Sequence, residues 1–446
     1  MSFPISEASP IRFAAPLPAR ADVVVVGGGV IGVMTAWFLR EKGLSVVVCE
    51  KGRIAGEQSS RNWGWVRQQG RDPAELPIMV EALAIWKRLA AEMGEVLGFR
   101  QTGVLYMAKT EAEIAGFEAW TEHSRAHQLD TRLLTGAETM AMLKGAAAPW
   151  KGGLFTASDA RAEPWVAVPA LAAAAEDRGV VIREACAVRG LDLAAGKVAG
   201  VVTEAGRVAC DHVVVAAGAW SRLFLGQHGI RIPQLSVLAS VAATEPMPEV
   251  FAGNAADDDF AFRRRADGGY SIAPGARHDF FIGRDAFASF GVYLPVLKKD
   301  FRSTTFRLLA PKGFPDAWGT PRRWALDGES PFERQRILNP APNMKTLAQV
   351  QDSFARAFPA LGRPKLKTAW GGMIDSLPDV VPVVDHAPIP GLTIATGMSG
   401  HGFGIGPGIG RVVADLVTGR PTGHDLTRFR LSRFSDGSRI EPGPSL

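Results

Sequence analysis

Apolar residues near the N-terminus occur first as an unbroken run and then at helical spacing. Val23–Val26 form a four-valine run, which is typical of a strand buried on both faces of a parallel sheet. Residues 33–42 carry apolar side chains at the spacing of a helix, and Gly43 follows them as a helix-closing residue. Another apolar run occupies residues 44–50. This order predicts a strand, a helix and a second strand of a parallel sheet.

Further periodic segments lie along the rest of the chain. Helical spacing predicts helices over 75–95, most of 110–145, 163–178, 347–361 and 409–419. Apolar runs predict strands at 99–108, 180–188, 212–218 and 391–397, and a hairpin at 191–211. Residues 235–345 show scattered strand-like runs without strand–helix alternation. The tail, residues 435–446, is expected to be disordered.

A glycine pattern links the first two predicted strands. Gly27, Gly29 and Gly32 satisfy the spacing G-x-G-x-x-G directly after the valine run. The first glycine allows a tight turn, the second lets the backbone approach a pyrophosphate, and the third allows close helix–strand packing. Glu50 follows Gly32 by 18 residues, at the end of the second strand, where a carboxylate binds ribose hydroxyls. A ligand-free glycine turn is the alternative, but the complete arrangement favours binding of an adenine dinucleotide.

The composition is that of a globular protein of about two domains. The 446 residues are 47% hydrophobic and 21% charged, and the formal net charge is +5. Lys and Arg form no long run, so we expect no nucleic-acid partner. The three cysteines have neither metal-ligand nor CxxC spacing, which predicts buried free thiols, no metal site and a reducing compartment. Residues 1–20 lack the apolar run of a secretion signal, and we expect a cytoplasmic protein without a transmembrane segment.

Four sequence blocks occur in an order that one enzyme family shares. The first is DVVVVGGGVIG at 22–32 with Glu50, and the second is SSRNWGW at 59–65. The third combines CAVRGL at 186–191 with HVVVAAGAWS at 212–221, and the fourth combines WGGMIDSLPDVVPVVD at 370–385 with GLTIATGMSGHGFGIGPGIG at 391–410. Together they resemble the D-amino-acid oxidase (DAO) family of FAD-dependent oxidoreductases, which includes glycine oxidase, sarcosine oxidase and bacterial D-amino-acid dehydrogenases. The resemblance is looser over 235–345.

The resemblance implies non-covalent FAD and assigns residues to its site. Arg61 would pair with the pyrophosphate, and a helix starting near Pro407, after a glycine-rich loop, would direct its N-terminal dipole at the flavin. Gly371 and Gly372 stand where the sarcosine-oxidase branch has a Cys bonded to FAD, so no covalent link is expected. The implied FAD-binding residues are Gly27, Gly29, Val30, Ile31, Gly32, Glu50, Lys51, Ser59, Ser60, Arg61, Asn62, Val188, Ala217, Gly218, Trp220, Gly372, Asp375, Gly400, His401, Gly402, Phe403, Gly404 and Ile405.

The arginine that clamps the substrate carboxylate in many family members is missing. At the place of their G-x-R-P segment the chain has residues 371–375, GGMID. We therefore expect a replacement cation on the predicted strand over 260–273, a polar pocket wall from a tyrosine of that strand, and a histidine that polarises the amine. The candidates are Arg264, Arg263, Tyr270 and His278, and then Arg67 and Arg71, which follow the SSRNWGW block. Each has a plain alternative: a solvated position for the arginines and the histidine, and core packing for the tyrosine.

The resemblance also implies the fold. It is α/β, with a discontinuous Rossmann-like FAD-binding domain and an inserted α+β substrate domain that has a mixed or antiparallel sheet. The expected division is an N-terminal extension at 1–20, the FAD-binding domain at 21–75, 151–234 and 366–434, the substrate domain at 76–150 and 235–365, and a tail at 435–446.

The implied reaction is FAD-dependent oxidation of a C–N bond in an amino acid or related amine. Hydride transfer from the α-carbon to flavin N5 would give an imine, which hydrolyses to an oxo acid and ammonia or a smaller amine. Two alternatives stay open: oxidation of a secondary (N-methyl or N-carboxyalkyl) amino acid, and a flavin-bearing subunit of a hetero-oligomeric dehydrogenase. The electron acceptor, oxygen or a quinone-type carrier, also stays open, because Ser271 stands where the sarcosine-oxidase branch has an oxygen-activating lysine.

Overall fold

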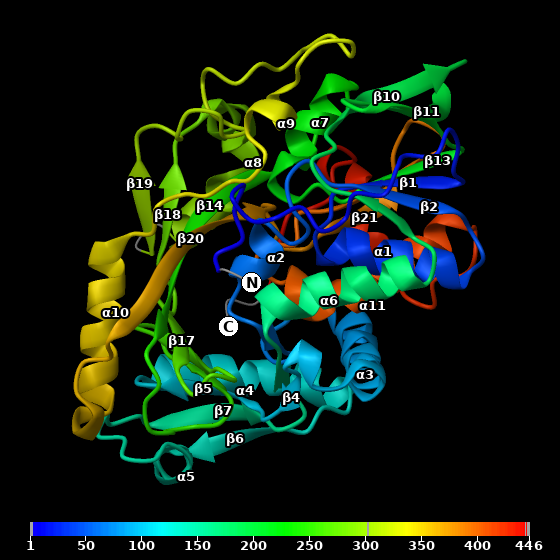
Figure 1. Ribbon diagram of the computed structural model, residues 1–446. Coiled ribbons are helices and arrows are strands. Elements are labelled where there is room, and N and C mark those ends of the chain that lie inside the picture. Colours follow the sequence, from blue (N-terminus) through cyan, green and yellow to red (C-terminus); the bar gives the residue numbers. More distant parts are fainter. Residues whose placement is uncertain (1–2, 301–302, 442, 444–446) are drawn as a thin grey trace.

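The computed structural model describes residues 3–300, 303–441 and 443 (Figure 1). Its helices are α1 Val30–Glu41, α2 Gln58–Arg61, α3 Leu76–Met93, α4 Glu111–Ala126, α5 Gly136–Met142, α6 Pro164–Asp177, α7 Ser221–Gln227, α8 Arg284–Asp300, α9 Pro331–Arg334, α10 Met344–Ala357 and α11 Gly402–Val417. Its strands are β1 Val23–Val26, β2 Val46–Cys49, β3 Trp65–Val66, β4 Arg100–Gln101, β5 Val104–Ala108, β6 Thr131–Thr135, β7 Gly152–Thr156, β8 Ala160–Arg161, β9 Val181–Arg183, β10 Val188–Ala194, β11 Lys197–Thr203, β12 Gly206–Ala209, β13 His212–Val215, β14 Leu235–Thr244, β15 Asn254–Ala256, β16 Ala261–Arg264, β17 Tyr270–Ala273, β18 His278–Phe281, β19 Thr304–Arg307, β20 Leu366–Ser376, β21 Val383–His386 and β22 Leu392–Thr396.

The first sheet has the strand order β21-β22-β13-β1-β2-β9. β1 lies between β13 and β2, and both pairs are parallel. All four valines of β1 are buried, as the unbroken apolar run predicts. The six strands come from three separate chain segments, within 23–49, 181–215 and 383–396. The discontinuous α/β arrangement expected from the sequence is therefore confirmed.

A second sheet with mixed strand directions stands beside the first (Figure 1). Its order is β19-β18-β14-β17-β16-β15-β5-β7-β6, and β20 pairs with β14 over nearly its whole length. Two of these strands lie on the other side of the expected domain boundaries. β7 pairs with β5 and β6, and β20 pairs with β14, although residues 152–156 and 366–376 were assigned to the FAD-binding domain. By strand pairing, these two boundaries fall after β7 and after β20.

Helix α11 packs closely against α1 and α3, next to the first sheet (Figure 1). Its glycines permit this contact: a Cβ at Gly408 would lie 2.6 Å from the carbonyl oxygen of Ile78, and one at Gly410 would lie 2.6 Å from the carbonyl carbon of Met34. Residues 402–410 of the glycine-rich stretch are thus helical, and the helix begins at Gly402 instead of near Pro407. The glycines of α11 therefore allow it to pack closely against α1 and α3.

Three other segments differ from the sequence-based expectation. α8 is a 17-residue helix in a region where we expected strands. Its Phe287 and Phe290 are exposed, so the apolar residues of this helix do not follow its buried face. Within 110–145, β6 interrupts the helices. In the tail, Asp436 forms an ion pair with Arg430 (2.9 Å), which anchors its first residues. No helix among the described residues has the length and apolar character needed to cross a bilayer.

Candidate active site

An elongated cavity opens at the carboxyl ends of the parallel strands. Val26, Cys49, Ala216 and Thr396 stand at or just after the ends of β1, β2, β13 and β22, and all four line the cavity. Ligands of open α/β sheets bind at this edge. The second sheet also contributes, because Val241 of β14 belongs to the lining. The cavity therefore lies where the two sheets meet.

Most residues that the sequence assigns to the cofactor line this cavity. They are Gly27, Gly29, Val30, Ile31, Glu50, Lys51, Ser59, Arg61, Asn62, Val188, Ala217, Gly218, Trp220, Gly372, Asp375, Gly400, His401, Gly402 and Phe403. The lining does not include Gly32, Ser60, Gly404 and Ile405, which are all buried apart from it. A Cβ at Gly32 would lie 2.0 Å from the carbonyl oxygen of Gly27, so this glycine permits the helix–strand contact expected from the motif.

The turn between β1 and α1 has the features of a phosphate site. Gly29 is the N-cap of α1 and provides no side-chain cap, but the N–H of Val30 donates to the hydroxyl of Ser59 (2.9 Å). The N–H of Ile31, which also lines the cavity, is left to face a ligand. A Cβ at Gly27 would lie 2.5 Å from a backbone oxygen at the end of β13. The Glu50 carboxylate accepts hydrogen bonds from the N–H groups of Gly28 (2.7 Å) and Gly52 (2.6 Å). Glu50 thus braces the turn while it lines the cavity.

Arg61 is bound by protein oxygens. Its Nε donates to the carbonyl of Gly56 (3.1 Å), and one terminal nitrogen donates to the carbonyl of Gly371 (2.9 Å) and the amide oxygen of Asn339 (2.8 Å). The other terminal nitrogen donates to the carbonyl of Ile5 (2.9 Å). These contacts use four of the five N–H donors of the guanidinium to join the N-terminal segment, α2 and β20. Arg61 still lines the cavity with one donor left, and its pairing with phosphate stays a prediction.

The turn between β22 and α11 shapes one end of the cavity. The Asp375 carboxylate accepts a hydrogen bond from the N–H of Gly397 (2.8 Å), which ties β20 to this turn. Gly397, Ser399 and Gly400 have φ angles of +75°, +49° and +84°, so the backbone is left-handed at three of four successive residues. α11 begins directly after His401, and its N-terminal turn lines the cavity. The positive end of the helix dipole therefore lies at this end, as expected.

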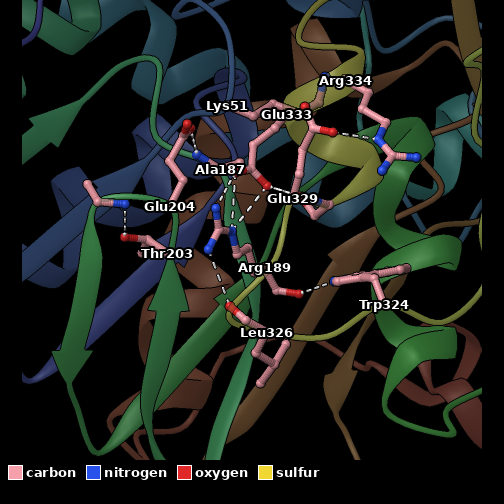
Figure 2. A network of polar contacts seen from close by, with 12 residues as sticks. Lys51, Ala187, Arg189, Thr203, Glu204, Trp324, Leu326, Glu329, Glu333 and Arg334 are labelled. Carbon is pink, nitrogen blue, oxygen red and sulfur yellow. Dashed lines mark hydrogen bonds and ion pairs between the residues drawn. The ribbon is translucent and has the colours of Figure 1, made fainter.

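Residues 329–338, which include the Glu333 and Arg334 of Figure 2, form a strap that contributes to the wall of the cavity. Phe332 of the strap lines the cavity beside Trp220, with ring centroids 5.7 Å apart. Lys51 Nζ donates to the strap carbonyls of Gln335 (3.0 Å) and Arg336 (2.6 Å). Since the strap belongs to the segment 235–365, part of the expected substrate domain completes the cofactor cavity.

Two ion pairs fasten this strap to the small sheet formed by β10, β11 and β12 (Figure 2). Glu333 pairs with Arg189 of β10 at 2.6 Å, and both side chains are mostly buried. Arg336 pairs with Glu204 at 2.6 Å. A third strap pair, Arg334 with Glu329, is exposed and stays within the strap. The mostly buried pairs therefore hold the strap in place, and the exposed pair is expected to contribute little.

Glu333→Gln should release the cofactor faster. Charge-assisted hydrogen bonds contribute about 1.5–3 kcal/mol, so we expect FAD dissociation to accelerate about tenfold or more. The recovery of free-flavin fluorescence after dilution measures this rate. Arg334→Gln, in the same strap, is the matched control and should leave the rate unchanged. Equal dissociation rates for wild type and Glu333→Gln would show that the strap does not retain FAD.

Arg263 does not supply a free cation to the cavity. Its guanidinium forms a two-bond ion pair with Glu163 (2.8 and 3.0 Å), and its Nε donates to the carbonyl of Trp63 (2.6 Å). Arg263 and Glu163 are 0% and 4% exposed, and Arg263 is not among the cavity-lining residues. Strand alternation places the side chains of Arg263 and Phe262 on opposite faces of β16, as expected. The carboxylate that Arg263 binds is that of Glu163, not that of a substrate.

The remaining predicted catalytic residues also lie outside the cavity lining. Tyr270 packs in the core between Phe262 and Phe354 of α10, and its hydroxyl accepts a hydrogen bond from the N–H of Val250 (2.8 Å). Arg264 donates to the carbonyl of Met247 (2.8 Å) and lies over the Tyr270 ring. His278 lies on β18, with a ring nitrogen 3.0 Å from the hydroxyl of Thr304. The structure therefore gives these side chains packing roles and does not gather them at the site.

Two other arginines do reach the cavity. Arg67 and Arg71 both belong to its lining, and Arg71 is 2% exposed. One terminal nitrogen of Arg71 has no hydrogen-bond partner among the described residues. Burial, with help from Arg67, lowers the pKa of Arg71 to about 9, which leaves it charged at neutral pH. A buried cation with an unused donor is the feature that a bound anion would complete.

A glutamate–histidine pair lies next to Arg71. Glu75 is completely buried, and His401 Nδ1 lies 3.3 Å from its Oε2. Burial acts to raise the pKa of Glu75, but His401, Arg71 and Arg67 together hold it below its usual value. Burial and the nearby Arg71 lower the pKa of His401 to about 4. At neutral pH the site therefore contains a carboxylate, a neutral imidazole and two guanidinium groups.

Some of these residues were missed in the sequence. Arg67 and Arg71 were secondary candidates for the substrate cation, whereas Glu75 was not considered. Its only signal was its place directly after them, just before the predicted helix. Phe332 carried no such signal, because its approach to the cavity depends on how a distant segment folds back.

Comparisons with known proteins agree with this geometry. A family model described as FAD dependent oxidoreductase (DAO) matches residues 22–416. The solved L-amino acid deaminase from Proteus myxofaciens, in complex with anthranilate, has 31% identity and a TM-score of 0.91, and the match covers 97% of each chain. The L-amino acid deaminase from Proteus vulgaris has 32% identity and a TM-score of 0.89, with 95% of this chain and 100% of that chain covered. The sarcosine oxidase subunit beta of Rhizobium meliloti is 25% identical over 94% of this chain and 90% of its own length.

The donor set fits FAD, since the N-terminal turn of α1, Glu50 and the N-terminus of α11 line one cavity. The chain belongs to the DAO family of FAD-dependent oxidoreductases, enzymes that act on C–N bonds, and FAD is its cofactor.

Proposed function

We propose that the protein oxidises an α-amino acid with a primary amine to a 2-oxo acid and ammonia. FAD supplies the two-electron acceptor, and the imine product hydrolyses in water. One observation carries the proposal: Arg71 is a buried, partly unpaired cation in the cavity lining. An α-carboxylate would complete its hydrogen bonding and would replace the arginine that is missing from the segment at 371–375.

The apolar wall beside Arg71 supports a substrate with a large apolar side chain. Arg67 lies over the Tyr106 ring at 5.5 Å, and Trp65 lies 6.2 Å from the same ring. Trp63 and Trp65 are 5.4 Å apart and both line the cavity, together with Val241. Aromatic walls of this kind bind aromatic or branched side chains better than the hydrogen of glycine. Similarity to L-amino acid deaminases supports the L configuration.

Oxidation of a secondary amine is the second candidate. Similarity to a sarcosine oxidase subunit beta favours it, and that name also favours a hetero-oligomer. An N-methyl amino acid would use Arg71 in the same way but would give an aldehyde and a primary amine as products.

A substrate panel separates the two candidates. Holoenzyme is supplied with a quinone analogue under nitrogen and tested with L- and D-amino acids and with their N-methyl forms. We expect the highest kcat/KM with an aromatic or branched L-amino acid, with ammonia released. Higher kcat/KM for N-methyl substrates, with formaldehyde released, would favour the second candidate. Repeating the assay with oxygen alone tests which acceptor is used.

A further inference from the structure

We propose that Glu75 and His401 form the amine-binding half of the substrate site, and that substrate carboxylate binding at Arg71 switches His401 into a proton acceptor. This inference rests on the proposed function. It adds that the two ends of the amino acid are recognised by coupled groups, so that the base becomes effective only when the substrate is in place.

Several buried polar atoms beside Arg71 lack hydrogen-bond partners. Among the described residues, Oε1 of Glu75, a terminal nitrogen of Arg71 and the indole nitrogen of Trp65 are buried without a hydrogen-bond partner, and Oε2 of Glu75 meets only Nδ1 of His401, at 3.3 Å. Buried polar groups are nearly always paired in folded proteins. A cluster of unpaired groups in and behind a cavity wall therefore marks where a polar ligand binds.

The arrangement of the pair gives its two residues different roles. His401 lines the cavity, whereas Glu75 is fully buried and is not part of the lining. The Glu75 carboxylate, 3.3 Å from Nδ1, favours the tautomer with the proton on Nδ1. That tautomer leaves the lone pair on Nε2 for a ligand in the cavity. Glu75 is thus a positioning residue, and His401 is the group that meets the substrate amine.

Electrostatic interactions couple His401 to Arg71. The charged groups that act on His401 are Glu75, which raises its pKa, and Arg71 and Arg67, which lower it. Without substrate, burial and the arginines dominate, and the pKa of His401 is about 4. A carboxylate bound to Arg71 neutralises part of the opposing charge and leaves Glu75 to act on His401. Substrate binding therefore raises the basicity of the imidazole.

The resulting proton balance is simple. An amino acid arrives with an ammonium group, which must lose one proton before the α-carbon can give up a hydride. The N–H bond of the ammonium breaks, and the proton forms a new bond to Nε2 of His401. Glu75 stabilises the imidazolium that results. The proton returns to water when the product leaves.

The first test measures proton uptake and needs no turnover. Benzoate, a carboxylate without an amine, is added to wild-type holoenzyme in weak buffer at about pH 5.5, between the pKa of His401 and its ordinary value. We expect binding, seen as a shift of the flavin spectrum, to be accompanied by uptake of a substantial fraction of one proton. His401→Asn should bind benzoate without proton uptake. Wild-type binding without proton uptake would overturn the coupling.

The second test measures anaerobic flavin reduction by stopped flow at saturating amino acid across pH. Glu75→Gln should reduce the rate about 10- to 100-fold near pH 7 and recover at high pH, where the substrate arrives as a neutral amine. Glu81→Gln is the matched control, because Glu81 lies on α3 and pairs with His424 and Arg411 away from the cavity lining.

The outcomes separate this inference from the proposed function. If no α-amino acid bleaches the wild-type flavin, the proposed function fails. If wild type is bleached and Glu75→Gln keeps the wild-type rate and pH profile, the proposed function stands and this inference is overturned. If Glu75→Gln does not hold FAD, His401→Asn takes its place in the flavin-reduction measurement with the same expectation.

Discussion

Arg71→Met should lower kcat/KM for the best α-amino acid by about 30- to 4,000-fold, which corresponds to about 2–5 kcal/mol. The methionine keeps most of the volume but leaves the substrate carboxylate without a cation in a buried site. Because Arg71 also helps to hold down the pKa of the buried Glu75, its removal should lower the free energy of unfolding too, and urea unfolding measures that loss separately from kcat/KM. FAD content should stay at the wild-type level, which absorbance of the purified protein reports.

Arg71→Lys provides the matched comparison. A lysine keeps the charge but loses the two-bond geometry, so it should recover part of kcat/KM. An amine substrate without a carboxylate should react equally with wild type and Arg71→Met. If Arg71→Met keeps normal kcat/KM for amino acids, the anchor is not Arg71, and Arg67 becomes the candidate.

Arg263→Met should mainly affect stability and not catalysis: it should lower the free energy of unfolding by about 3–5 kcal/mol. The change leaves Glu163, which is 4% exposed, without its two-bond partner in the interior. Urea unfolding of the purified protein measures the loss. Among folded molecules that hold FAD, KM for the amino acid should change little, because Arg263 is bound by the protein.

The double variant Glu163→Gln with Arg263→Met tests the cause. Removing both charges should restore part of the lost stability, since no isolated charge remains buried. If Arg263→Met instead raises KM strongly and leaves stability unchanged, Arg263 would be the substrate anchor after all.

The nucleotide-type half of the fold could be predicted because its signals are local. The valine run, the glycine spacing and the strand-end Glu50 each depend on neighbouring residues, and the structure places them at one cavity as expected. Helix–strand packing at Gly32 follows from the same motif. Such patterns predict the structure correctly because they depend only on the backbone geometry of neighbouring residues.

The rest of the site depends on contacts between distant segments. Strand alternation correctly separates the direction of the Arg263 side chain from that of Phe262. Its partner Glu163 lies 100 residues earlier in the chain, and no sequence periodicity reveals that ion pair. Arg61 donates to carbonyls of Ile5 and Gly371, so most donors of this guanidinium join α2 to the N-terminal segment and β20, contacts that no local pattern predicts. The strap is a similar case, since Phe332 reaches the cavity only through the folding of the whole second domain.

A single anaerobic turnover of wild-type holoenzyme with an excess of an aromatic L-amino acid shows whether the flavin oxidises amino acids. We expect complete loss of the oxidised flavin absorbance, with one 2-oxo acid and one ammonia formed per FAD. Flavin that stays oxidised with every α-amino acid, but is bleached by an amine without a carboxylate, would contradict this expectation.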